Sequence, residues 1–418
     1  MRYEQFERAF DAEGYDQMEV YGTRKNRRTF GMSDNRLKTA EENEDIMVGV
    51  RVLVDNRVGF SSSSNPQNIL ETARRAVKLA EVSQSKMMSF PLKNDFESVE
   101  GLYDDNLVGK STENIIGELK NSVEFPEGID VSDAKIEVSE SEVFLVNSNG
   151  VRGDYRKSSK SGYVSLTDGD ISRFSFHSDT RNFPFERVAS RAKRLLEDSR
   201  NRIEVSSGRY DVVLTPFALR QILSGLFYPA ISAETVQNGE SFLEDRIGDR
   251  VFSEDISIKD YGRLPRGNGS RSFDREGVSS QETKIVDEGV LNSFLYDVKH
   301  AEREGTASTG NASGGPGSTP SIAPSNIVLE GSEGEKSGDL IINSVSGVHT
   351  ADRTTGEYSL NITCGFVDED GIKGLKSGVL VGDVISLLDS FSHFYGDVEK
   401  VGELISRKAV FEDQKIVV

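Results

Sequence analysis

The sequence predicts an α+β protein with two domains, in which helices lie on an antiparallel sheet and a β-rich part with few helices follows. The chain has 418 residues, which is too long for one ordinary hydrophobic core. Its first part contains two similar strand–strand–helix patterns, and after residue 203 short strands separated by Gly, Asn, Asp and Ser turns predominate. We therefore expect an N-terminal domain over 1–205 and a C-terminal domain over 206–418.

The first strand–strand–helix pattern lies between residues 46 and 80. IMVGVRVL (46–53) and RVGFSS (57–62) flank Asp55-Asn56, a pair typical of tight hairpin turns. A helix is expected to begin after Asn65-Pro66. Its apolar residues recur at helical spacing on one face: Ile69, Leu70, Ala73, Ala76, Val77 and Ala80.

The second pattern repeats the first about a hundred residues later. GYVSL (162–166) and ISRFSF (171–176) flank Asp168-Gly169, which is the stronger hairpin signal. The helix that follows has one apolar face, formed by Val188, Ala189, Ala192, Leu195 and Leu196. Segments that look like antiparallel pairs precede the two patterns, around 18–40 and around 135–156. Two such units predict helices laid on one face of a curved antiparallel sheet.

A strand and a well-formed helix start open the second half of the chain. Asp211–Leu214 reads as a strand, Thr215 stands at the helix cap and Pro216 at the first helical position. Such a junction is a common place for catalytic residues, yet 216–233 contains no Asp, Glu, His or Cys. The apolar residues Leu219, Ile222, Leu223, Leu226 and Phe227 fall at helical spacing. They predict a helix that packs on the core.

The rest of the second half reads mainly as strands. Strands are expected within 283–297, around a Glu288-Gly289 turn, and over 325–330, 338–345 and 358–367, with one more helix over 382–391. The segment 305–325 is rich in Gly, Ser and Pro. It is either a disordered tether or an ordered loop with a function, and the sequence does not decide between the two.

Composition narrows the possible partners. The net charge is −19, and a field of that sign repels phosphate backbones, so we expect no direct nucleic-acid partner. A single cysteine, Cys364, excludes an internal disulfide and a thiolate metal cluster. The first ten residues lack the apolar stretch of a signal peptide, and no uncharged apolar run approaches the roughly 20 residues of a membrane helix. A cytoplasmic protein without a membrane partner is expected.

Single residues that could carry chemistry each have an ordinary structural explanation. Ser224 has no histidine nearby in sequence and no G-x-S-x-G surroundings. Asp274 and Glu276, interleaved with Arg271 and Arg275, could act as an acid–base pair, but such turns are more often solvated loops. No two histidines have a metal-ligand spacing; the four are His177, His300, His349 and His393. These residues alone predict no complete active site.

Five segments carry a family resemblance, because they occur together in a fixed order. They are SRSFDREGV (270–278), ETKIVDEGVLNSFLYD (282–297), STGNAS (308–313), APSNIVLEGS (323–332) and TTGEYSLNITCGFV (354–367). Together they resemble the TldD/PmbA family, also described as modulators of DNA gyrase and as peptidase U62-like proteins. VGVRVLVDNRVGFSSS (48–63) is similar as well. The resemblance therefore covers nearly the whole chain.

The resemblance implies a two-subunit zinc metalloprotease. Its TldD-type subunit carries H-E-x-x-x-H on a helix, which binds zinc and supplies the general base, and its PmbA-type subunit, also called TldE, lacks that motif. Counting back from Gly239-Glu240-Ser241, which the family shares, places the motif positions near Ser224, Gly225 and Pro229. Zinc needs about three protein ligands, and Pro229 also fits poorly inside a helix. The resemblance implies a TldE-like chain with no metal and no catalytic residue of its own.

A TldE-like chain implies particular partners and contacts. We expect zinc in a TldD-type partner subunit, a heterodimer or a homodimer, and an unfolded peptide as substrate. Gly310, Asn311, Ser325 and Asn326 match family motifs at both ends of the long loop, and are expected to contact the peptide. They could equally do no more than shape a turn. Two other functions remain open: a gyrase-modulator-like interaction role without proteolysis, and an autonomous hydrolase with an unrecognised site.

Overall fold

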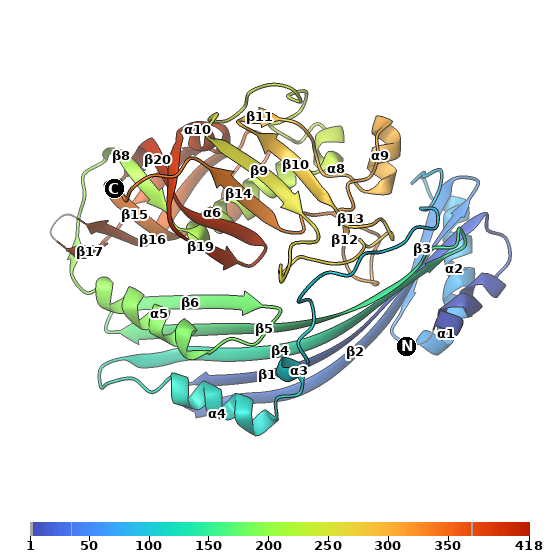
Figure 1. Ribbon diagram of the computed structural model, residues 1–418, viewed down its shortest axis with the longest axis horizontal. Helices are drawn as coiled ribbons and strands as arrows, with labels where there is room; N and C mark the ends of the chain where they lie inside the picture. The colour runs from blue at the N-terminus through green and yellow to red at the C-terminus, as the bar shows by residue number, and fades with distance from the viewer. Residues whose placement is uncertain (1–2, 35, 369–370) are drawn as a thin grey trace.

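The N-terminal half of the chain is built on one six-stranded antiparallel sheet, in the order β3-β2-β1-β4-β5-β6 (Figure 1). The computed structural model describes residues 3–34, 36–368 and 371–418. The strands of this sheet are β1 (Gln17–Ser33), β2 (Arg36–Val54), β3 (Arg57–Ser63), β4 (Asp130–Asn147), β5 (Arg152–Asp168) and β6 (Ile171–Asp179). The α+β class predicted from the sequence is confirmed.

The two repeated units meet at the centre of this sheet, where β1 pairs with β4. Both predicted hairpins are present as β2–β3 and β5–β6. Their turns use positive φ at Asp55, Asn56 and Gly169, which these residue types tolerate. The strands are longer than expected, because the second strand of each predicted preceding pair runs on into the first strand of the hairpin. Each unit therefore contains three strands.

The helices of both units lie on the same face of the sheet, as predicted. The main ones are α2 (Ile69–Val82), α4 (Thr112–Ser122) and α5 (Glu186–Asp198). On β4, Ala134 and Ile136 pack with α4 and α5, while Phe144 and Val146 pack with α2. All four have even numbers, and the register of β4 with β1 does not shift between them, so they share one face. The odd-numbered Leu145 packs against the C-terminal half.

Short elements complete the N-terminal half of the chain. They are α1 (Tyr3–Glu7), η1 (Arg8–Asp11), η2 (Pro66–Asn68) and α3 (Asp105–Val108). Asn65 caps η2 by accepting a hydrogen bond from Gln67 N at 3.0 Å, as the Asn-Pro pair suggested. No helix among the described residues is long and apolar enough to cross a membrane.

The C-terminal half forms a twelve-stranded sheet that closes partly on itself. β18 pairs with both β16 and β20, so β20, β8, β15, β16 and β18 form a barrel. The strands are β7 (Arg202–Ile203), β8 (Gly208–Leu214), β9 (Ile256–Tyr261), β10 (Glu282–Asp287), β11 (Val290–Leu291), β14 (Ile327–Gly331), β15 (Leu340–Ser346), β16 (Glu357–Asp368), β17 (Ile372–Leu375), β18 (Val379–Asp383), β19 (Phe391–Val401) and β20 (Leu404–Val417).

Few helices accompany this sheet, as the sequence indicated. They are α6 (Pro216–Ile222), η3 (Leu223–Phe227), α7 (Tyr228–Ala230), α8 (Ala233–Gln237), α9 (Val298–Glu304), η4 (Val348–Thr350) and α10 (Val384–Asp389). The strand expected at the end of 283–297 is much shorter than predicted. β11 has two residues, and the chain then turns toward α9.

The Gly/Ser/Pro-rich segment 305–325 is an ordered hairpin. β12 (Ala312–Ser313) pairs with β13 (Ser321–Ile322). Its tip reaches the N-terminal sheet, since a Cβ atom added to Gly49 of β2 would overlap the carbonyl oxygen of Pro316. Figure 1 shows this hairpin between the two halves of the molecule. Of the two alternatives for this segment, an ordered loop is therefore correct and a disordered tether is wrong.

Candidate functional site

The helix after β8 begins where the sequence places it. The Thr215 side chain accepts a hydrogen bond from Ala218 N at 3.4 Å, and Pro216 occupies the first turn of α6. All five residues of the predicted apolar stripe are fully buried: Leu219, Ile222, Leu223, Leu226 and Phe227. Burial of this face stabilises the helix whether or not it carries any chemistry.

The helix contains a π-turn at the place where the resemblance puts the zinc motif. Tyr228 N–H donates to Leu223 O, five residues back. In an α-helix, residues five apart point about 140° away from each other, whereas the hydrogen bond of a π-turn stacks such residues. Ser224 and Pro229, the expected histidine positions, are five apart. This segment thus has the geometry that a five-residue ligand spacing requires.

Pro229 corrects one expectation from the sequence. It lies inside the helix, in α7, instead of ending it. The π-turn immediately before it changes the backbone hydrogen-bond pattern, which is a known way for a helix to accommodate an irregular residue. Proline therefore does not exclude a helix here.

The residues on this helix do not fit a zinc ion. Ser224, Gly225 and Pro229 are half-buried, and none has a side chain that zinc uses. A Cβ atom on Gly225 would overlap Cγ1 of Val348, from η4, so a longer side chain there requires η4 to give way. Across the described parts of the chain, no group of three or more His, Cys, Asp or Glu residues could hold a metal.

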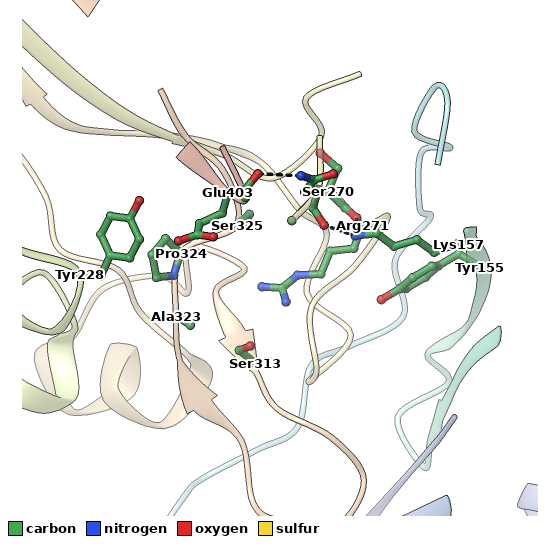
Figure 2. Close-up of a pocket in the computed structure, with 13 residues that line it drawn as sticks. Tyr155, Lys157, Tyr228, Ser270, Arg271, Ser313, Ala323, Pro324, Ser325 and Glu403 are labelled. Carbon is green, nitrogen blue, oxygen red and sulfur yellow. Dashed lines mark hydrogen bonds between the residues drawn. The ribbon is translucent and has the colours of Figure 1, made fainter. Parts of the chain in front are cut away.

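A cavity of about 450 Å³ lies next to this helix, between the two halves of the molecule. Figure 2 shows its walls: Tyr155 and Lys157 come from β5, Tyr228 from α7, and Arg271 from the loop after β9. The other lining residues are Asn268, Gly269, Ser270, Ser313, Ala323, Pro324, Ser325, Gly402 and Glu403. Its size is within the range of small-molecule sites, roughly 300–1,000 Å³.

The polar groups of the cavity are held from several directions. Lys157 Nζ donates to the carbonyl oxygens of Asn268 and of Ser270, the latter at 3.1 Å. Glu403 accepts hydrogen bonds from Arg220 Nε at 3.1 Å and Nη2 at 2.9 Å. Burial, together with the positive charges of Arg271 and Lys400, lowers the pKa of Lys157 to about 7.

Two of the four predicted peptide-contacting residues surround a buried aspartate. Asp260 Oδ2 accepts a hydrogen bond from Asn311 Nδ2 at 2.7 Å and one from Ser325 Oγ at 3.0 Å. Asp260 Oδ1 accepts one from Ser325 N at 2.6 Å. Burial raises the pKa of Asp260 against the lowering effect of these bonds. Asn311 is fully buried, so its amide is used inside the protein.

The other two predicted peptide-contacting residues, Asn326 and Gly310, are the sequence neighbours of Ser325 and Asn311. Asn326 is fully buried, and its Nδ2 donates to Tyr261 O at 2.8 Å and Ser270 Oγ at 2.9 Å. Gly310 has a φ of 73°, a conformation that glycine adopts without strain. The structure thus brings all four predicted residues together. The amides of Asn311 and Asn326 are used inside the protein, and contact of the four residues with a peptide stays a prediction.

The 271–276 segment also differs from its predicted form. Asp274, Arg275 and Glu276 are buried, with at most 2% of each exposed, so the expected solvated loop is wrong. Arg51 of β2 binds Glu276 at 2.6 Å and Glu19 at 3.1 Å, and Arg275 binds Glu19 at 3.0 Å. We call Glu19, Arg51, Asp274, Arg275 and Glu276 the ion cluster. It joins the two halves of the molecule through the pairs Arg51–Glu276 and Arg275–Glu19.

The histidines and the cysteine remain apart from one another. His300 is buried and its Nδ1 lies 2.7 Å from Asp297 Oδ1, His349 is exposed, and His393 Nε2 lies 2.8 Å from Glu335 O. Burial lowers the pKa of His177 to about 4 and raises that of the Cys364 thiol to about 11. A buried, protonated thiol is a poor nucleophile.

Sequence reasoning missed most of the cavity. Tyr155 and Lys157 are two apart on a strand and so point to one face, a pattern visible in GDYRK (153–157). Nothing local shows that this face meets Tyr228, because the residues are more than seventy positions apart. The alternating pattern of β5, which places Tyr155 and Lys157 on one face, was therefore the only sequence signal for this cavity.

The fold and the site together define a metallopeptidase-like chain whose motif helix carries no metal ligand. The chain belongs to the PmbA/TldD family. Residues 18–80 match the model of PmbA/TldA metallopeptidase domain 1, residues 110–200 that of the central domain, and residues 207–417 that of the C-terminal domain.

Individual relatives agree with this assignment. An uncharacterised protein of Methanocaldococcus jannaschii is 31% identical over 381 residues, covering 88% of this chain and 89% of its own length. The metalloprotease PmbA of Escherichia coli O157:H7 is 25% identical over 361 residues, covering 80% and 77%. The crystal structure of TldE from Thermococcus kodakarensis has the same fold, with a TM-score of 0.86, 21% identity and 97% of each chain covered.

Proposed function

We propose that this chain is the non-catalytic subunit of a TldD/TldE-like zinc metalloprotease that degrades or processes unfolded peptides in the cytoplasm. The observation that carries the proposal is the motif helix. It keeps its packing face and a π-turn at the position of H-E-x-x-x-H, but the residues there do not fit zinc. A TldD-type partner then supplies the zinc and the general base.

The chain's own contribution in this proposal is dimerisation and peptide binding. The cavity beside the motif helix offers main-chain groups of residues 323–325 together with charged and hydroxyl side chains. Main-chain groups can bind extended peptides with little demand on peptide sequence. The name of one relative, metalloprotease PmbA, supports a role in proteolysis.

Co-expression with a TldD-type subunit that carries H-E-x-x-x-H tests the proposal. We expect a complex on gel filtration, zinc in that complex, and cleavage of an unfolded peptide by the complex alone. The isolated chain is expected to hold no stoichiometric zinc and to cleave nothing. One tightly held zinc per isolated chain, or cleavage by it, would contradict the proposal. A complex without any proteolysis would favour the interaction-only, gyrase-modulator-like role.

A further inference from the structure

Two cations line the cavity without forming an ion pair. Within the described residues, Lys157 and Arg271 have no salt bridge to a carboxylate, although the chain as a whole carries a charge of −19. The hydrogen bond that Arg271 makes, from Nη2 to Gly310 O, is long at 3.4 Å. Lys157 donates to two carbonyl oxygens and keeps a third N–H.

Lys157, Lys400 and Arg271 lie close enough at this end of the cavity to repel one another, although Arg271 also lies near the buried carboxyl groups of Asp260 and Asp274. The pKa of Lys157 is lowered first by burial, then by Arg271 and by the nearby Lys400. Lys400 is itself paired with Asp179, at 2.8 Å. An anion next to Lys157 and Arg271 would therefore remove a repulsion that the free protein retains.

Two residues that line the cavity, Tyr228 and Arg271, each have a buried donor group without a partner among the described residues. The Tyr228 hydroxyl is buried and makes no hydrogen bond within the described structure, and its side chain belongs to a residue that is only 9% exposed. Arg271 Nε is also buried without a partner there. Figure 2 shows the Arg271 guanidinium between Tyr155 on one side and Pro324 and Tyr228 on the other. Unsatisfied buried donors cost free energy unless a ligand accepts from them.

The opposite wall limits which anion fits. Glu403 lies near Pro324 and Tyr228 in Figure 2, and although Arg220 binds it, its negative charge disfavours a ligand with two or more charges. A carboxylate carries one charge and accepts two parallel hydrogen bonds from a guanidinium. A phosphate group, with roughly two charges near neutral pH, fits this wall less well.

We propose that this cavity binds a peptide carboxylate, with Arg271 and Lys157 as its anion-binding pair and the Tyr228 hydroxyl as a further donor. The inference rests on the proposed function in that the ligand is taken to be a peptide. The carboxylate comes either from the C-terminus of the peptide or from an acidic side chain, and both sources supply the same chemistry.

Calorimetric titration of the full-length chain tests this directly. Three probes are compared: acetyl-trialanine with a free carboxylate, its C-terminal amide, and an amidated peptide of the same length with a central glutamate. We expect binding of at least one carboxylate probe about ten-fold tighter than that of the amide. The free-carboxylate probe identifies a terminus and the glutamate probe a side chain. Equal affinity for all three overturns the proposal.

Variants assign the binding to these residues. Arg271→Gln and Lys157→Met are each expected to weaken carboxylate binding about ten-fold or more. Arg271→Lys should weaken it less than Arg271→Gln, because lysine keeps the positive charge but lacks the two parallel N–H donors of the guanidinium. Arg209→Gln and Lys376→Met, at exposed surface pairs, serve as matched controls without effect. Circular dichroism confirms that each variant is folded. Unchanged affinity in folded Arg271→Gln protein contradicts the proposal.

A pH series separates Lys157 from its neighbours. The titratable and charged groups near it are Tyr155, Tyr228, Arg271, Lys400 and Glu403. Since the pKa of Lys157 is about 7, about nine-tenths of it is in the ammonium form at pH 6 and about one-tenth at pH 8. Carboxylate affinity should therefore fall several-fold between about pH 6 and about pH 8, and Lys157→Met should abolish this fall.

The outcome is independent of complex assembly. Carboxylate binding by the isolated chain, without any complex on gel filtration, would support the cavity and contradict the subunit role. A proteolytic complex would support the subunit role, and equal affinity of this chain for the carboxylate and amide probes would contradict carboxylate binding in the cavity.

Discussion

The ion cluster and the cavity both lie where the two halves of the molecule meet, and both contain arginine, but they differ in how charge is matched. In the ion cluster, Arg51 and Arg275 each contact a carboxylate within 3.1 Å. In the cavity, Lys157 and Arg271 contact only main-chain oxygen among the described residues. Charges that are already matched hold the protein together, whereas unmatched charges beside a cavity can attract a ligand.

The largest expected effect comes from breaking the ion cluster. Arg51→Met leaves Glu276 buried without its paired cation and Glu19 with Arg275 alone, and removing one partner of a buried pair typically costs about 3–5 kcal/mol. Urea unfolding should show this loss of stability. Arg24→Met, at an exposed pair with Glu44, is the control, and about 1 kcal/mol or less is expected there. Similar losses in both variants would contradict the structural role of the cluster.

A smaller loss is expected at the asparagine beside Asp260. Asn311→Ala removes a donor to a buried carboxylate, which costs about 1–3 kcal/mol when the acceptor is left unsatisfied. The exposed Asn121→Ala, on α4, should change stability by less than about 0.5 kcal/mol. Thermal unfolding measures both. Normal stability with impaired peptide cleavage in the complex would instead support direct contact between Asn311 and the peptide.

The pH dependence of stability should identify Glu276. Burial raises its pKa from 4.5 to about 7, while Arg51 opposes the rise. The folded state then holds more protons than the unfolded state between these two values, so this group makes stability fall as pH rises from about 4.5 to about 7. Glu276→Gln should reduce that slope in urea unfolding, and the exposed Glu254→Gln should not. An unchanged slope in Glu276→Gln would exclude this group as its source.

No loss of stability is expected in the cavity. Tyr228→Phe removes a buried hydroxyl without a partner, so stability should stay the same or rise by about 1 kcal/mol at most. Tyr103→Phe, whose hydroxyl binds Glu140 at 2.7 Å, should lose about 1 kcal/mol. Only Tyr228→Phe should weaken carboxylate binding. A stability loss at Tyr228 as large as at Tyr103 would show that its hydroxyl already has a structural role.

Local features of the fold could be predicted from the sequence, whereas contacts between distant segments could not. Local patterns predicted the hairpin turns at Asp55-Asn56 and Asp168-Gly169 and the buried stripe of α6, because turn chemistry and helical periodicity act over a few residues. The segment 271–276 was misjudged, since its partners Glu19 and Arg51 are 256 and 225 residues distant. Alternating charge looks the same in a solvated turn and in a buried cluster.

In the candidate site, too, only the features that depend on neighbouring residues could be predicted. The motif positions Ser224, Gly225 and Pro229 could be placed from sequence because they lie in one helix. The π-turn could not, as it depends on a single backbone hydrogen bond. The cavity depends on β5 meeting the loop after β9, and Lys157 and Ser270 are 113 residues apart. No residue spacing in the sequence predicts this contact between β5 and the loop after β9.

The π-turn also sets the rotational phase of everything that follows it. Because the turn holds one residue more than an α-turn, winding the same residues into a regular α-helix would rotate the next segment by about 100°. The buried stripe before the turn would stay in place, while Tyr228 would swing away from Arg271 and Lys157. The backbone hydrogen bond from Tyr228 to Leu223, with no change in side-chain chemistry, therefore decides whether Tyr228 faces the cavity.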